Sequence, residues 1–204
     1  MTNKIKILKI IYSFLPEDEK NKCDVFNFSK YVNKTLQIQK CKEKCNAILS
    51  SFQNTFNSFI VVDWTDFDSG NCCELKILLH ENENLIDDDK ALLKKLGGKR
   101  RDLRIFLSLI SEYCFYFVEE TEYNEKTSGW TFTSISENEA MDSNTIKKLN
   151  ELIKELGYTR INQELAKMIV PDIKMDFIDA GNVTVFNCLF TDLIELFDSK
   201  VVYE

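Results

Sequence analysis

Glycine, proline and histidine are scarce in this sequence. Its 204 residues include six glycines, two prolines and one histidine. The shortage of glycine and proline favours long regular elements joined by short connections. A single histidine excludes a metal site built from several histidines, and any catalytic pair or triad that needs histidine has to use His80.

Long apolar stretches are also missing. No segment approaches the roughly 20 consecutive apolar residues that a membrane helix requires. Lys4, Lys6 and Lys9 interrupt the apolar residues of the N-terminus, which leaves no continuous apolar segment for a signal peptide. We therefore expect a cytoplasmic protein with no membrane partner, and reduced thiols at its seven cysteines.

Motifs for metals and phosphates are absent as well. Cys41 and Cys45 lie on an apolar stripe, where cysteine fills a core, and together with the adjacent Cys72 and Cys73 they lack the spacing of zinc ligands. Residues 66–71 lack the later ligands of a calcium loop and are typical of a hairpin turn. Because the glycines before Lys99 also lack the spacing of a phosphate loop, we expect no metal and no cofactor.

The elements are predicted from hydrophobic periodicity. An N-terminal helix carries Ile7 and Ile11, with a strand as the alternative, and a long amphipathic helix covers about 29–57. Further helices are predicted over about 87–97, 103–110, 143–157, 161–169 and 191–197. Strands are predicted over about 59–64, 74–80, 113–121, 130–135, 173–177 and 183–190, the first four forming two hairpins.

Helices and hairpins alternate irregularly, and no internal repeat or flexible linker interrupts them. Apolar residues make up 44% of the chain and charged residues 29%, as in ordinary globular proteins. We predict a single α+β domain over residues 1–204, with a mainly antiparallel sheet against which amphipathic helices pack. The segment 136–142 is the one candidate boundary for a division into two domains.

Charge is distributed unevenly along the chain. Three of the four arginines fall within five residues, and the basic candidates for partner binding are Lys99, Arg100, Arg101 and Arg104. The acidic candidates are Asp87, Asp88, Asp89, Glu119, Glu120 and Glu122. The net charge of −7 counts against general binding of nucleic acids and favours a basic protein partner. A surface carrying both signs is typical of protein recognition.

Candidate catalytic groups are few. By strand alternation His80 falls on a polar face, and we expect it to be exposed. Glu120 and Glu122 share one face of a predicted strand while Glu119 lies on the other, so the three do not form one tight carboxylate pair. An enzyme with an unrecognised active site remains an alternative, and it requires a cleft around His80 or a carboxylate pair.

A small, acidic α+β chain rich in Lys, Asn and Ile, without a catalytic motif, resembles the immunity proteins of bacterial toxin systems. The resemblance lies in general character, so it assigns a role to no particular residue. It implies a protein that neutralises a cognate toxin, often a basic nuclease, by direct binding. The competing hypothesis is a regulatory subunit that contacts nucleic acid or phosphate through residues 99–104.

Overall fold

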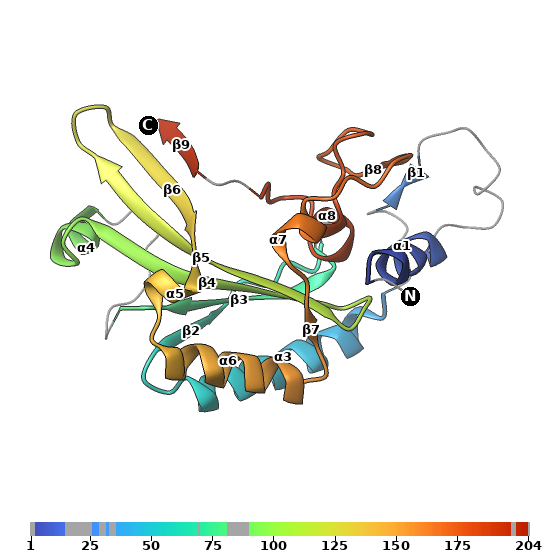
Figure 1. Ribbon diagram of the computed structural model, residues 1–204, viewed down its shortest axis with the longest axis horizontal. Helices are drawn as coiled ribbons and strands as arrows, with labels where there is room; N and C mark the ends of the chain where they lie inside the picture. The colour runs from blue at the N-terminus through green and yellow to red at the C-terminus, as the bar shows by residue number, and fades with distance from the viewer. Residues whose placement is uncertain are drawn as a thin grey trace.

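Helices and a largely antiparallel sheet make up the computed structural model, which describes residues 3–14, 26–28, 32, 36–68, 70–80, 90–196 and 199–203 (Figure 1). The predicted α+β class is confirmed. None of the helices formed by these residues has the length and apolar character needed to span a bilayer.

The main sheet has the strand order β2-β3-β4-β5-β6-β9, and every neighbouring pair on this path is antiparallel. Its strands are β2 (Ile60–Asp63), β3 (Cys72–Leu78), β4 (Lys99–Ser108), β5 (Tyr113–Asn124), β6 (Gly129–Ile135) and β9 (Ser199–Tyr203). The short β7 (Thr159–Arg160) adds to β5 in parallel. A separate parallel pair joins β1 (Phe26–Asn27) to β8 (Ile173–Lys174).

One face of the sheet is covered by two helices. Helix α3 (Ile38–Thr55) and helix α6 (Ser143–Glu155) lie side by side beneath it (Figure 1). They pack on the inward residues of the central strands, among them Leu75, Ile105 and Tyr116, which are almost fully buried. Burial of this apolar area is the main contribution to the stability of the layer.

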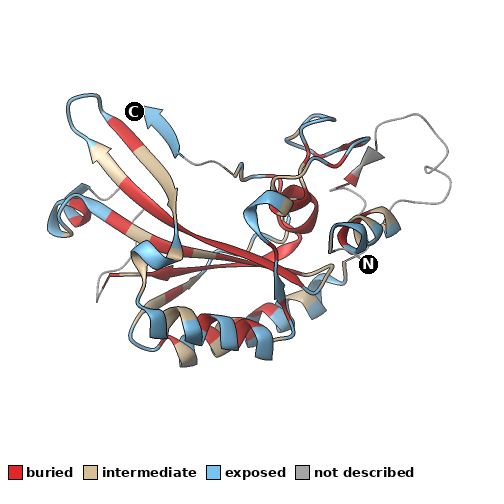
Figure 2. Ribbon diagram, in the orientation of Figure 1, coloured by how far each residue is buried: buried red, intermediate tan, exposed pale blue. Residues whose placement is uncertain are grey.

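The other face is divided into an aromatic half and a charged half. Helices α1 (Asn3–Ser13), α7 (Gln163–Ala166) and α8 (Val185–Leu189) pack over the aromatic half. There Phe106 and Phe186 meet edge to face with ring centroids 5.1 Å apart. Figure 2 shows that the central strands are buried along most of their length.

Several local predictions are confirmed. The N-terminal segment is helical, and both predicted hairpins form, as β2–β3 and β5–β6. Asp142 caps α6 by accepting hydrogen bonds from the N–H groups of Asn144 and Thr145. Helix α4 (Lys90–Lys95) is followed by Gly97, whose φ of 82° suits glycine. Within the helix predicted over 29–57 the structure describes α3 from Ile38 to Thr55, while residues 29–31 and 33–35 lie outside the described residues.

The helix predicted over 103–110 is wrong, because these residues belong mostly to strand β4. Strand β4 lies between β3 and β5 with both faces covered, so Phe106 on one face and Leu107 on the other are both fully buried. A strand buried on both faces loses the alternation of polar and apolar residues. Its apolar positions then match helical spacing as well as they match a strand.

Two of the C-terminal predictions are also wrong in type. The segment predicted as a buried strand over 183–190 is buried, but it forms α8. Thr184 and Asn187 make a reciprocal capping box that starts this helix. Residues 191–196 form no helix, and the unpredicted strand β9 follows. At the predicted strand over 173–177 only β8 forms, and α7 is shorter than predicted over 161–169.

The segment between 136 and 142 contains α5 (Glu137–Ala140).

Reduced thiols at all cysteines were expected, and this is wrong for two of them. Cys45 of α3 and Cys73 of β3 form a disulfide that joins the helix layer to the sheet. Cys72 therefore has no vicinal bond to Cys73, and it is a buried free thiol. The side chains of Cys72 and Cys73 point to opposite faces because strand residues alternate. Only Cys73 faces α3.

Candidate functional site

The basic and acidic clusters meet across β4 and β5. On the face near α5, Lys99 lies opposite Glu122 and Arg101 opposite Glu120. Arg101 donates from Nε to Oε2 of Glu120 at 2.7 Å, and Lys99 forms ion pairs with both glutamates. Although burial alone would raise it, these hydrogen bonds hold the pKa of Glu120 below its ordinary value. The positive charges of β4 and the negative charges of β5 therefore neutralise each other on this face.

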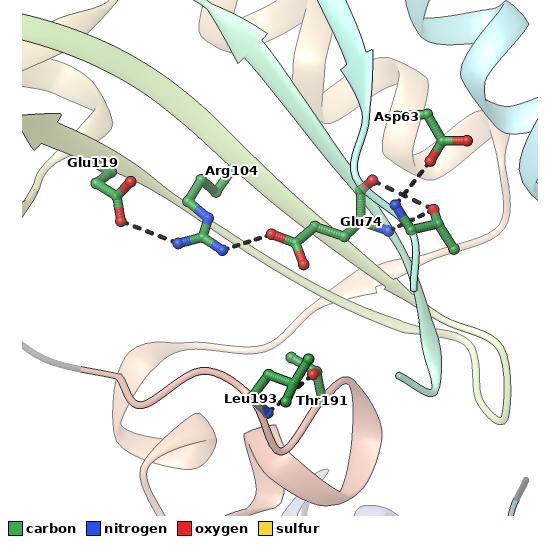
Figure 3. Close-up of polar contacts among 7 residues, drawn as sticks. Asp63, Glu74, Arg104, Glu119, Thr191 and Leu193 are labelled. Carbon is green, nitrogen blue, oxygen red and sulfur yellow. Dashed lines mark hydrogen bonds and ion pairs between the residues drawn. The ribbon is translucent and has the colours of Figure 1, made fainter. Parts of the chain in front are cut away.

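A second set of ion pairs lies on the opposite face and is more deeply buried. Arg100 donates to Asp102 at 2.9 Å, and both side chains are almost inaccessible. Arg104 is held between Glu74, at 2.6 Å, and Glu119, at 3.1 Å (Figure 3). The side chains of this Glu74–Arg104–Glu119 triad link three neighbouring strands, β3, β4 and β5, in addition to their backbone pairing.

The triad borders the aromatic half of the sheet. The Arg104 guanidinium lies 5.5 Å from the ring centroid of Phe106 and 5.8 Å from that of Phe117. Burial raises the pKa of the Glu74 carboxyl above its ordinary value, although Arg104 and Lys76 oppose this shift. Glu74 is thus a carboxylate whose desolvation the neighbouring bases do not fully offset.

A pocket of about 310 Å³ opens above the triad. Figure 3 shows Glu74 and Arg104 on the sheet side, with Thr191 and Leu193 of the segment after α8 facing them. The pocket is lined by Trp64, Asp66, Gly70, Cys72, Glu74, Arg104, Thr191, Leu193 and Ile194. Its walls therefore combine apolar side chains with the carboxylates of Asp66 and Glu74.

The loop between β2 and β3 positions the rim of this pocket. Asp66 accepts a hydrogen bond from the N–H of Asp68 at 2.8 Å, and Asp63 accepts one from Thr65 at 3.0 Å. The N–H of Gly70 returns to the carbonyl of Asp66 at 3.0 Å. A Cβ at Gly70 would lie 2.7 Å from that carbonyl oxygen, so only glycine closes the loop in this way.

His80 is not exposed, contrary to the expectation from strand alternation. Only 8% of it is accessible, and neither ring nitrogen has a hydrogen-bond partner among the described residues, which do not include 81–89. Asp102 Oδ1 and Thr121 Oγ1, which belong to neighbouring strands, are likewise buried without a partner. Unpaired buried polar atoms are costly, and in the triad Arg104 Nε is likewise buried without a partner among the described residues.

Metal-binding groups do not assemble in the described residues, where no three His, Cys, Asp or Glu side chains surround a common point. The free cysteines Cys72, Cys114 and Cys188 are buried, and Cys41 is half-buried. Burial raises the pKa of the Cys114 thiol to about 12. The buried thiols are therefore protonated at neutral pH and poorly suited to bind a metal or to act as nucleophiles.

The structure distributes the candidate residues over several environments. Arg100, Glu119 and Glu120 are buried. Arg101 is partly accessible and paired. The side chains of Lys99 and Glu122 are half-exposed. Asp87, Asp88 and Asp89 lie outside the described residues.

Sequence reasoning missed Trp64, Asp66 and Glu74, for which the only local signal was an aspartate-rich turn.

Strand β9 is a further feature that sequence reasoning missed. It pairs with β6 on one side, and no other described strand pairs with its second side. All five of its residues are exposed, including Val201, Val202 and Tyr203. An uncovered edge strand with exposed apolar side chains presents unpaired backbone groups to other chains.

No protein-family model matches the chain, and comparison with curated proteins and with solved structures likewise finds no match.

Proposed function

We propose that this protein binds another protein and inhibits it, in the manner of the immunity proteins of bacterial toxin systems. The docking surface in this proposal is the free edge of β9 together with the half-exposed charges of the adjoining face. The occupant of the edge is an extended segment of the partner, which adds a strand to the sheet.

The exposed edge of β9 is the observation that carries the proposal. In strand addition the backbone hydrogen bonds supply affinity, and alternate side chains supply specificity. The two valines and the tyrosine of β9 offer apolar side chains to both faces of an added strand. Proteins that do not use an edge for binding commonly shield it with charges, proline or a covering element. Here Lys200 is the one charged residue within the strand.

The charged rows of β4 and β5 continue toward this edge. Glu122 lies opposite Thr131, and Thr131 lies opposite Val201, so Lys99, Glu122 and Val201 belong to one row across the sheet. Because Lys99 and Glu122 are already paired with each other, they contribute more to selecting a partner than to affinity. A partner with complementary charges at the same spacing is the one that fits this surface.

Capture followed by reconstitution tests the function. The tagged chain is expected to retrieve a single partner from its native cell with a Kd below about 1 µM. The purified partner is then expected to lose its activity when the chain is added at an equimolar amount. If the partner keeps full activity in a saturated complex, inhibition is ruled out.

The docking surface is tested by adding a charge to the strand edge. Val201→Lys is expected to weaken partner binding about tenfold, because it places a charge in the row that an added strand covers. Ile169→Lys is the matched control, since Ile169 is 47% exposed against 49% for Val201 and belongs to no strand of the main sheet. Titration calorimetry measures both. Equal Kd values for the two variants would contradict docking at β9.

A further inference from the structure

The pocket above the Glu74–Arg104–Glu119 triad has a composition that its structural role does not require. The ion pairs of the triad are made by its own three members, and only Arg104 Nε lacks a hydrogen-bond partner among the described residues, so the triad does not need apolar walls or a further carboxylate above it. Trp64 and Leu193 nevertheless line the pocket while remaining 37% and 51% exposed. Asp66, which is exposed and held by its own turn, adds a second carboxylate to that of Glu74.

We propose that this pocket receives a basic side chain of the partner protein, with its cationic head between Asp66 and Glu74 and its apolar stem against Trp64 and Leu193. The inference rests on the proposed function, because the side chain belongs to the partner. It also identifies a second contact, separate from the β9 edge.

Charge complementarity selects a cation as the occupant. Arg104, the one base among the described residues that line the pocket, has both terminal guanidinium nitrogens bonded to carboxylates and only Nε without a partner, so it attracts an anion less than an unpaired arginine would. The carboxyl of Glu74 remains under-compensated, as its raised pKa shows. A further cation beside it, in addition to Arg104 and Lys76, would stabilise its ionised form.

The aromatic wall favours the same class of ligand. Lys76 Nζ lies 4.3 Å from the centroid of the Trp64 ring, so the indole already binds an ammonium group on this side of the sheet. Lysine and arginine carry apolar stems that pack on exposed apolar surface while the charged head stays with polar groups. The volume of about 310 Å³ lies at the low end for ligand sites and suits one side chain.

Fluorine NMR of the full chain tests the chemistry of the pocket without the partner. The two tryptophans are labelled with 5-fluorotryptophan, and Trp64→Phe assigns the Trp64 signal. The n-butylguanidinium ion is expected to shift the Trp64 signal in a saturable way, whereas n-butylurea, which has a similar shape and no charge, is not. Equal responses to the two probes, or no response, would overturn the proposal.

Two aspartates of the same loop supply matched variants. Asp66→Asn is expected to weaken binding of n-butylguanidinium about threefold, because it removes one carboxylate from the rim and keeps the oxygen that caps the turn. Asp63→Asn makes the same change at the other turn, which does not line the pocket, and is expected to have no effect. Equal affinities for the two variants would contradict the assigned site.

The partner complex separates this inference from the proposed function. Asp66→Asn is expected to weaken the complex while Asp63→Asn does not. If the partner is inhibited but neither the probe nor Asp66→Asn has an effect, the pocket assignment fails and the proposed function stands. If the probe binds but no protein is inhibited, the proposed function fails, and with it the assignment of the cation to a partner.

Discussion

Replacing Arg104 with methionine is expected to lower the free energy of unfolding by about 3–5 kcal/mol. The substitution keeps an unbranched apolar stem but leaves Glu74 and Glu119 buried on the two strands that flank β4, without the cation that both contact. Each carboxylate has less than 10% of its side chain exposed, so water does not replace the lost partner. Urea denaturation followed by circular dichroism measures the effect.

The loss is expected to depend on pH in a defined direction. Burial already raises the pKa of Glu74 in the folded protein, so the folded state holds this proton more tightly than the unfolded chain does. For a carboxyl with a raised pKa, stability increases as the pH falls through the folded value toward the unfolded one. Without Arg104 the pKa of Glu74 rises further. The difference between Arg104→Met and the unmodified protein is therefore expected to shrink between neutral pH and about pH 5.

A triple substitution distinguishes a missing charge from a missing contact. Replacing Glu74, Arg104 and Glu119 together with methionine removes every charge of the triad, and it is expected to cost less than Arg104→Met alone. If the triple variant is the less stable of the two, packing of the long side chains outweighs their electrostatics. Partial unfolding at the strand ends would appear as a lower denaturant slope and not only as a shifted midpoint.

Local signals in the sequence were sufficient to predict those elements that have one buried face and one face exposed to solvent. Helix α6 has a buried stripe, a solvent face and an Asp142 cap, and each of these is visible within about four residues of sequence. The β5–β6 hairpin is likewise defined by apolar runs on both sides of a short turn. For such elements the periodicity and the turn chemistry indicate the same structure.

Local signals failed where tertiary packing covers a segment on all sides. Residues 105–108 of strand β4 and all of helix α8 are buried, so neither segment retains an exposed polar side that marks its period. Apolar pattern alone does not separate a buried strand from a buried helix. The prediction was reversed at both: a helix was assigned to most of β4 and a strand to α8.

The candidate site shows the same limit at the level of side chains. The acidic and basic clusters are separate in the sequence. In the folded protein the register of β4 and β5 places Arg101 opposite Glu120, so the positive and negative charges neutralise each other. The contact of Arg104 with Glu74 spans 30 residues, and the segment facing them comes from beyond residue 190. A site assembled from three distant segments leaves no spacing that a motif search recognises.

Loss of the Cys45–Cys73 disulfide is expected to lower the free energy of unfolding by about 3 kcal/mol. The bond joins residues that are 28 positions apart, and it restricts the unfolded chain over the segment that contains the end of α3, all of β2 and the loop bearing Asp66. The double variant Cys45→Ala and Cys73→Ala is compared with the unmodified protein by urea denaturation. Repeating the measurement with a reducing agent tests the bond without a change of side chain.

The neighbouring cysteines provide the controls for this prediction. Cys41 and Cys72 are free, and each lies close in sequence to one of the bonded residues, so Cys41→Ala and Cys72→Ala remove a thiol and keep the bridge. Only the double variant is expected to lose its sensitivity to reducing agent. A reductant-independent stability of the unmodified protein would show that the bond does not form in solution.

The disulfide and the pocket occupy opposite faces of β3, and this arrangement separates stability from binding. Cys73 faces α3, whereas Cys72 and Glu74 belong to the pocket face. Under conditions where the double variant is fully folded, it is therefore expected to bind n-butylguanidinium as the unmodified protein does. If its affinity falls instead, the bridge also holds the Asp66 loop in position, because the β2–β3 pairing alone would then be too weak to hold the pocket rim.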